Sequence, residues 1–216
     1  MTHFNISIVS DTVCPWCYVG KKRLERAISQ HQQTHPNDTF STTWHPFYLD
    51  PTAPVPGEDK QQRYARRFGA ARTAAMQARL AQLGAAEGIR FAFGGRTGNT
   101  RDSHRLIQLG KQTSSSLQTR VVEELFAAYF ERERDITDRG VLREAGVRAG
   151  LDGGVVERWL AEGKGGDEVD GEVEEARRRF VQGVPHFTVN GRWEVGGAED
   201  AEAFLGVFAE VKRAEG

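Results

Sequence analysis

The stretch SDTVCPWCYVGKKRLE, residues 10–25, contains both cysteines of this 216-residue chain, Cys14 and Cys17. Two cysteines separated by two residues are typical of a redox dithiol or of half a metal site. Pro15 suits the first position of a helix, because its fixed φ is helical and its missing N–H is not needed there. We therefore expect a helix that begins at Pro15, with Cys14 as its N-cap residue.

This position favours chemistry at the sulfur of Cys14. An N-cap side chain lies near the free backbone N–H groups of the first turn, at the positive end of the helix dipole. A thiolate is stabilised there relative to a thiol, so Cys14 is expected to be the nucleophile. Cys17 lies one turn further into the helix and is expected to be the less exposed cysteine, which resolves a mixed disulfide. The alternative is a pair of inert buried cysteines.

A zinc site is a competing explanation for the same cysteines. With His31 and His35 they give the pattern C-x2-C-x13-H-x3-H, a spacing known from zinc fingers. In a helix from Pro15 to about residue 33, His31 would lie about 20 Å from Cys17 along the axis. We therefore expect no metal here, and we expect both histidines to be solvated groups near the helix end.

The sequence around the dithiol predicts a β-α-β unit. Residues 4–10, FNISIVS, alternate apolar and polar side chains and are rich in β-branched residues, as half-buried strands are. The helix is expected to end near His35, and residues 39–49 predict a second strand.

The C-terminal part predicts a matching α-β-β-α unit. A charged helix over residues 167–183 precedes two short alternating runs that flank Asn190 and Gly191. Asn-Gly in this setting is the strongest sequence signal for a two-residue β-hairpin. An amphipathic helix over residues 200–214 follows.

From about residue 60 to residue 164 the sequence favours helices alone, several of which end at glycine. Brought together, the two ends form a thioredoxin-like α/β sheet, and the middle is an inserted all-helical domain. We assign residues 1–57 and 166–216 to a discontinuous thioredoxin-like domain and residues 58–165 to the helical insertion.

Composition excludes several classes of function. The chain is 38% hydrophobic and 27% charged, with a net charge of −1, so we expect no general attraction to nucleic acid or to anionic membranes. The N-terminus does not resemble a signal peptide, and we expect a cytoplasmic protein. In that compartment a pair of nearby cysteines is more often catalytic or metal-binding than a structural disulfide.

Four segments in order resemble the DsbA-like thioredoxin-fold oxidoreductases, and most closely the FrnE-type branch. They are SDTVCPWCYVGKKRLE at residues 10–25, NT…SHRLI at 99–107, LFAAYFERERDI at 125–136 and GVPHFTVNG at 183–191. The resemblance spans nearly the whole chain. It implies thiol–disulfide exchange through the CPWC dithiol of a thioredoxin domain that a helical domain interrupts.

The resemblance also assigns supporting residues. Pro185 matches the proline that this fold holds in the cis form beside the cysteines, which would leave the backbone of Val184 free to pair with an extended substrate. Trp16 either stacks on substrate or shields the dithiol. It stands where strongly oxidising relatives carry a histidine, so a less oxidising dithiol is expected.

Two further polar residues draw attention. Asp11 is either a proton relay to Cys17 or, as is more usual for a loop aspartate before a helix, a cap or a solvated group. His104 is expected to be a packed structural histidine and not a ligand.

The leading hypothesis is a thiol–disulfide oxidoreductase that oxidises, reduces or isomerises disulfides in peptides or small molecules. It needs no cofactor beyond the Cys14–Cys17 disulfide, and it leaves open glutathione as a co-substrate and a homodimer. The alternative is a glutathione-dependent transferase or isomerase of the kappa-class or 2-hydroxychromene-2-carboxylate isomerase type. Those relatives generally carry one serine where Cys14 stands. A non-enzymatic binding module with a vestigial dithiol is the third hypothesis.

Overall fold

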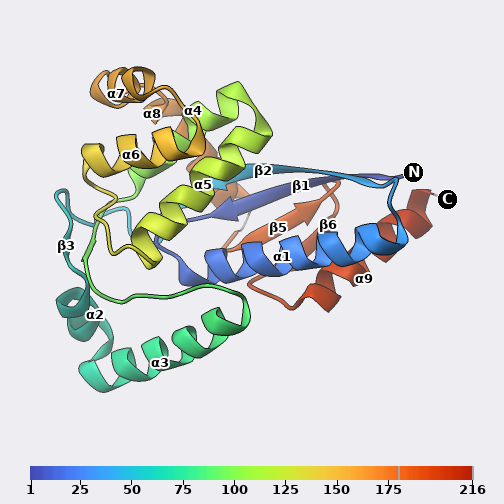
Figure 1. Ribbon diagram of the computed structural model, residues 1–216, viewed down its shortest axis with the longest axis horizontal. Coiled ribbons are helices and arrows are strands. Elements are labelled where there is room, and N and C mark those ends of the chain that lie inside the picture. Colours follow the sequence, from blue (N-terminus) through green and yellow to red (C-terminus); the bar gives the residue numbers. More distant parts are fainter. Residues whose placement is uncertain (180, 216) are drawn as a thin grey trace.

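A four-stranded mixed sheet forms the centre of the protein; its strands are β1 (His3–Ser10), β2 (Thr39–Pro46), β5 (His186–Val189) and β6 (Trp193–Gly196). The structure, a computed structural model, describes residues 1–179 and 181–215. The strand order is β2–β1–β5–β6 (Figure 1), with β1 parallel to β2 and antiparallel to β5. Both ends of the chain share this sheet, which confirms the predicted thioredoxin-like α/β fold.

One face of the sheet is covered by α1 (Pro15–Thr34) and α9 (Ala201–Glu215) (Figure 1). The alternation of β1 turns Phe4, Ile6 and Ile8 toward these helices, and each is at most 1% exposed. The Phe4 ring lies 4.7 Å from that of Phe40 and 4.9 Å from that of Phe208, between ring centroids. Burial of each such side chain stabilises the fold by about 1.5–3 kcal/mol, so this face holds α1 against the sheet.

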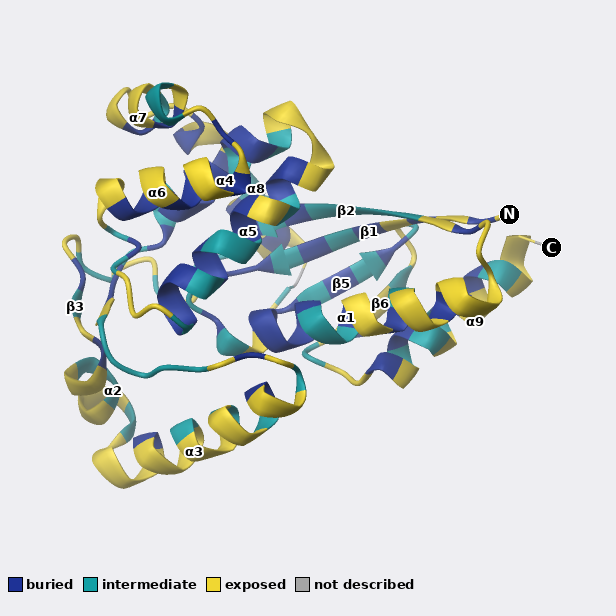
Figure 2. Ribbon diagram, in the orientation of Figure 1, coloured by how far each residue is buried: buried dark blue, intermediate teal, exposed yellow. Residues whose placement is uncertain are grey.

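The segment between β2 and β5 supplies the other helices. They are α2 (Lys60–Phe68), α3 (Ala70–Ala86), α4 (Arg101–Thr113), α5 (Ser115–Phe130), α6 (Arg139–Ala149), α7 (Gly153–Ala161) and α8 (Gly166–Arg178). α4, α5 and α8 pack against β2, whereas α2 and α3 pack on each other and project to one side of the molecule (Figure 1). Large parts of α3 and α7 are exposed, while α4 and α5 are buried along much of their length (Figure 2).

The sequence predicted helices alone in this segment, but the structure also contains two short strands. A short antiparallel ribbon joins β3 (Glu58–Asp59) to β4 (Arg96–Thr97) and pairs Glu58 with Thr97. Each strand has only two residues, which is too short to leave an alternating pattern in the sequence. The helical insertion is confirmed, and this ribbon is an addition to it that the sequence did not predict.

The predicted hairpin between β5 and β6 is confirmed, but its loop has three residues. Asn190 and Gly191 have φ angles of 47° and 67°, and the Arg192 N–H donates to the Val189 carbonyl at 3.1 Å. Val189 then pairs with Trp193, which leaves Arg192 as the extra loop residue. Asn-Gly thus forms the expected turn with two positive φ values, and Arg192 lengthens the loop by one residue.

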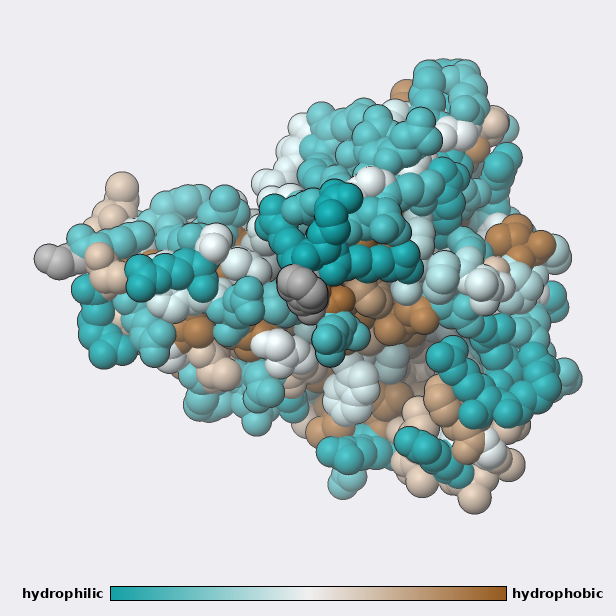
Figure 3. Space-filling view, turned by 180° about the vertical axis from the view of Figure 1, so that it is seen from behind, coloured by the Kyte–Doolittle hydropathy of each residue, from teal (hydrophilic) through white to brown (hydrophobic). Residues whose placement is uncertain are grey.

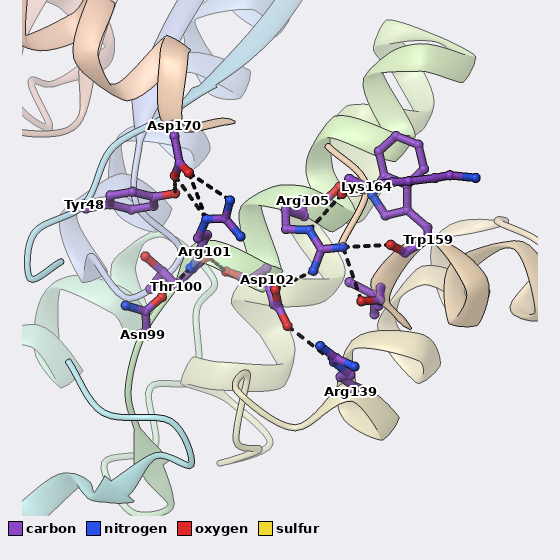
Figure 4. A network of polar contacts seen from close by, with 12 residues as sticks. Tyr48, Asn99, Thr100, Arg101, Asp102, Arg105, Arg139, Trp159, Lys164 and Asp170 are labelled. Atoms are coloured by element: carbon purple, nitrogen blue, oxygen red, sulfur yellow. Dashed lines mark hydrogen bonds and ion pairs between the residues drawn. The ribbon is translucent and has the colours of Figure 1, made fainter. Parts of the chain in front are cut away.

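Arg105 joins α4 to the end of α7 (Figure 4). Its side chain is 1% exposed, and its guanidinium donates to the carbonyls of Trp159 and Lys164, both at 2.7 Å, and to Asp102 at 2.6 Å. A planar guanidinium has five N–H donors in fixed directions, which suits several acceptors around one buried point. This contact holds the outer helices on the sheet-packed α4.

A second ion pair joins α4 to α8. Arg101 forms a two-pronged contact with Asp170 at 2.8–3.1 Å, and the Tyr48 hydroxyl donates to the same carboxylate at 2.8 Å (Figure 4). Burial, followed by the hydrogen bond to Asp170, raises the pKa of Tyr48. The start of α4 is therefore fixed to both α8 and the segment after β2.

Replacement of Arg105 by lysine tests the importance of this contact. We expect Arg105→Lys to lower the free energy of unfolding by about 2–4 kcal/mol, because one ammonium cannot reach all of these buried acceptors. Urea denaturation measures the change. The matched control is Arg139→Lys, whose guanidinium is 59% exposed and 3.5 Å from Asp102; we expect a loss of no more than about 0.5 kcal/mol there. Equal losses in the two variants would contradict this role of Arg105.

Candidate active site

The first turn of α1 begins as predicted. Cys14 is the N-cap residue, with extended backbone angles of −88° and 112°, and Pro15 is the first helical residue. The Cys14 N–H donates to the Asp11 carbonyl at 3.0 Å, and the Cys17 N–H donates to the Cys14 carbonyl at 3.1 Å. The Cys14 side chain accepts no capping hydrogen bond, so its sulfur is left for other contacts.

The two cysteines are free thiols with different environments. Cys14 is 4% exposed and Cys17 is 1% exposed, which is the predicted order. Burial raises the pKa of Cys17 well above the usual value, and its hydrogen bond with Cys14 adds to the increase. The Ser10 side chain and the Asp11 backbone act in the opposite direction but do not cancel it. Cys17 therefore keeps its proton at neutral pH.

The segment before β5 reaches the dithiol from the other end of the chain. The Cys14 thiol contacts the Val184 carbonyl, with 3.5 Å between sulfur and oxygen, across 170 residues of sequence. The Val184–Pro185 peptide bond is cis, and Pro185 is buried. The structure thus places Val184 and Pro185, which the family resemblance named, next to the active-site turn.

Gly20 is a site residue that the sequence analysis missed. A Cβ atom at Gly20 would lie 3.0 Å from Pro185 Cγ and 3.1 Å from Phe187 Cζ, closer than ordinary contacts. The missing side chain therefore lets Pro185 approach α1. Glycine inside a helix costs about 0.5–1 kcal/mol relative to alanine, and this cost was the available sequence signal.

Trp16 and Asp11 differ in their exposure to solvent. Trp16 is 37% exposed, so its indole is within reach of a bound substrate, whereas Asp11 is fully buried. Asp11 Oδ2 accepts from the Leu49 N–H at 2.8 Å, and Oδ1 has no hydrogen-bond partner among the described residues. The expectation of a solvated or capping aspartate is wrong, because the segment after β2 closes over this loop.

His104 is a packed residue, as expected. It is 3% exposed, and its Nε2 lies 3.1 Å from the Phe47 carbonyl and 3.4 Å from Asp11 Oδ1. Its ring also lies against that of Tyr48, with 5.8 Å between centroids. His104 thus fixes the segment after β2 on α4.

Of the two histidines at the other end of α1, His35 is exposed as predicted, whereas His31 differs from its prediction. His31 is 6% exposed, and its Nε2 lies 2.9 Å from Asp38 Oδ2, so it is not a solvated group. The ligand atoms of His31, His35 and Asp38 lie within 4.8 Å of one another, as a metal site would need. Lys212 already supplies a cation there, 2.5 Å from Asp38. Although burial opposes it, hydrogen bonds from Lys212 and His31 hold the pKa of Asp38 well below its usual range.

Comparison with known proteins agrees with this geometry. Residues 5–209 match the family model of the DSBA-like thioredoxin domain. None of the curated proteins compared with the chain matches it. Among solved structures, a probable DsbA oxidoreductase from Streptomyces coelicolor is 30% identical, with a TM-score of 0.86 over 96% of this chain and 89% of that chain.

Two other structures are similar at lower identity. The cytosolic disulfide reductase DsbM from Pseudomonas aeruginosa is 17% identical, with a TM-score of 0.63 over 98% of this chain and 100% of that chain. A 2-hydroxychromene-2-carboxylate isomerase is 14% identical, with a TM-score of 0.69 over 98% of this chain and 97% of that chain. These two similarities are evidence of a shared fold.

Alkylation tests the different states of the two thiols. In a Cys14→Ser variant, the remaining thiol should react slowly with iodoacetamide near pH 7, because a raised pKa leaves little thiolate. Its rate should rise about tenfold per pH unit up to at least pH 9, since the thiolate fraction does so below the pKa. Mass spectrometry of timed samples measures the rate, with Cys17→Ser as the control. A plateau below pH 8 would contradict a raised pKa for Cys17.

A second test concerns the contact between Gly20 and Pro185. Gly20→Ala should displace Pro185 by a few tenths of an ångström and lower the rate of disulfide exchange about tenfold, because small shifts at a reacting centre are costly. Gly206→Ala in α9 is the matched control, since a Cβ there meets nothing within 4 Å. The control should gain about 0.5–1 kcal/mol of stability from helix propensity and keep its rate. Equal exchange rates in both variants would exclude a positioning role for Gly20.

Proposed function

Because the chain belongs to the DsbA-like thioredoxin family, we propose that it is a thiol–disulfide oxidoreductase whose reacting dithiol is Cys14 and Cys17. The main support is the placement of the Cys14 sulfur at the start of α1, 3.5 Å from the Val184 carbonyl, with the protonated Cys17 one turn behind it. This arrangement separates a thiol that reacts first from one that reacts second.

The reaction takes place in two exchange steps. The Cys14 thiolate attacks one sulfur of a substrate disulfide, a Cys14–substrate disulfide forms, and the other substrate sulfur leaves as a thiolate that takes up a proton. Cys17 then loses its proton and attacks the Cys14 sulfur. The second substrate thiolate leaves, and the products are the Cys14–Cys17 disulfide and two substrate thiols. In the reverse direction the same steps oxidise a substrate dithiol.

Val184 and Trp16 supply contacts for the substrate. Val184 is half-buried and precedes β5, so its backbone suits pairing with an extended chain. Trp16 offers an exposed aromatic face next to Cys14. Pro15 and Pro185 hold the backbone on each side, and neither has an N–H that would compete with a bound chain.

We assign the protein to the FrnE-type branch, with a cytoplasmic location and disulfide-bearing peptides or small molecules as substrates. The similarity to a reductase named as cytosolic supports this assignment. No helix in residues 1–179 or 181–215 is long and apolar enough to cross a membrane. The division into residues 1–57 with 166–216, and 58–165 as an insertion, is part of the same proposal, as are the absence of a cofactor and of a nucleic-acid partner.

A trapping experiment tests the two roles. Cys17→Ser should accumulate Cys14–substrate disulfides, because the resolving thiol is gone, and Cys14→Ser should form none. Non-reducing gels of the variants, mixed with insulin or with a cell extract, should show higher-mass bands that dithiothreitol removes. The double variant is the control. Insulin reduction at the wild-type rate by Cys14→Ser would refute the redox function.

The glutathione-dependent alternative is tested by a separate assay of the same variants. The similarity to 2-hydroxychromene-2-carboxylate isomerase concerns the fold, and two cysteines in place of one serine favour exchange over conjugation. Conjugation of glutathione to 1-chloro-2,4-dinitrobenzene by wild type and by Cys17→Ser, with no insulin reduction, would favour a transferase instead.

A further inference from the structure

A cavity lies next to the active-site turn, between α2, α3 and the C-terminal end of α5. About 30 Å³ of this space has room for water, and the whole space between its walls, open solvent at the mouth included, is about 410 Å³. Its walls are largely aromatic, and Pro15 of the active-site turn forms part of them; the aromatic members are Tyr64, Phe91, Phe93, Tyr129 and Phe130. In Figure 3 hydrophobic residues reach the surface near the centre of the view and at its lower right, the side of α2 and α3. We call this space the Lys60 cavity, after the one cation that lines it.

Lys60 is buried, at 3% exposure. Its ammonium donates to the Tyr129 carbonyl at 3.1 Å and lies 3.8 Å from the centre of the Tyr129 ring. Lys60 forms no ion pair with a carboxylate among the described residues, and Glu133, the acid whose charge acts on it, accepts instead from the Gly94 N–H at 2.6 Å. Burial lowers the pKa of Lys60 to about 8.

A buried ammonium without a counter-ion is costly, because it has left water and uses few of its three donors. Two parts of Tyr129 offset part of this cost. Its carbonyl lies at the negative end of α5, and the face of its ring attracts the ammonium through a cation–π contact. A bound anion would offset more. The aromatic walls favour a planar or apolar body attached to that anion.

The Lys60 cavity also adjoins the reactive sulfur. Pro15, the residue after Cys14, is in its wall. Tyr64, which lines the same cavity, feels the dithiol electrostatically: burial raises its pKa, and a charge on Cys14 adds to that increase. A ligand in the cavity would therefore be held next to Cys14.

We propose that the Lys60 cavity binds small aromatic or apolar carboxylates, with the carboxylate on Lys60, and that it selects disulfides of this class as substrates for Cys14. The binding part stands by itself, whereas the substrate part rests on the proposed function. For an aromatic disulfide, the Cys14 thiolate forms a bond to one sulfur, the aryl thiolate leaves with the electron pair of the broken S–S bond, and Cys17 releases the second aryl thiolate as before.

The binding part is tested with two probes that share one ring system. Calorimetric titration of wild-type protein should show 2-naphthoate binding at least about tenfold more tightly than the uncharged 2-naphthamide, as expected for a charge-assisted hydrogen bond. Lys60→Met should bind both probes alike. Lys164→Met, which removes the same charge from a 58% exposed side chain, should keep the preference.

Equal affinities of the wild-type protein for the two probes would overturn the proposal, and this comparison needs no variant to fold. If Lys60 serves only to cap α5, Lys60→Met will lose stability and the wild-type protein will not distinguish the probes. Cys14→Ser should bind 2-naphthoate as wild type does. If Cys14→Ser binds 2-naphthoate and Cys14 of the wild-type protein does not react with disulfides, the binding site is retained and the redox function is rejected.

The substrate part is tested with reduced Cys17→Ser protein, which reacts once through Cys14. Stopped-flow absorbance gives its rate constants with 5,5′-dithiobis(2-nitrobenzoate), whose rings carry carboxylates, and with 4,4′-dithiodipyridine, whose rings carry none. The ratio of the two rates should exceed that of 2-mercaptoethanol by about tenfold or more, and Lys60→Met should bring it down to that of 2-mercaptoethanol. Reaction with both reagents at the ratio of 2-mercaptoethanol would overturn selection while leaving the redox function intact.

Discussion

The central position of β1 is the constraint on which the site depends. β1 is hydrogen-bonded to β2 on one side and to β5 on the other, and its last residues pair Val9 with His186. The chain leaves β1 at Ser10 and starts α1 five residues later, so the dithiol must lie at this edge of the sheet. The same register places Val184, two residues before His186, against Cys14. A shift of one residue would turn the buried face of β1 outward, so the core and the active site are fixed together.

The helices of the middle segment are joined to this edge by buried polar contacts. The Thr12 hydroxyl, two residues before Cys14, lies 2.7 Å from that of Ser103 on α4. α4 in turn holds α7 through Arg105 and α8 through Arg101. Water is largely excluded from Thr12, Ser103 and Arg105, so loss of a partner there would leave an unsatisfied polar group, whereas the Arg101–Asp170 pair is partly exposed. The middle segment therefore helps to hold the active-site turn in place, and it also forms most of the walls of the Lys60 cavity.

Charge is distributed unevenly around the dithiol. Cys17 is kept protonated by burial, and the Cys14 residue lies at the N-terminal, positive end of the α1 dipole. On the side of α2, Lys60 adds a buried positive charge that has no carboxylate partner among the described residues. The start of α1 and the buried Lys60 both favour the binding of anions next to the active-site turn. Disulfide exchange and the binding of small carboxylates thus have a common electrostatic basis.

The sequence by itself determined the strands of the central sheet, the start of α1 at Pro15 and the N-cap position of Cys14, because these depend on local alternation, capping and cysteine spacing. Pro185 was named through family resemblance. Tertiary structure decided the rest. The burial of Asp11 and His31, the ribbon at Glu58 and the close approach that requires Gly20 arise from segments far apart in the chain, which no local pattern records. The Lys60 cavity is the clearest case, since a lysine in a polar helix looks solvated until α5 and the aromatic residues before β4 close around it.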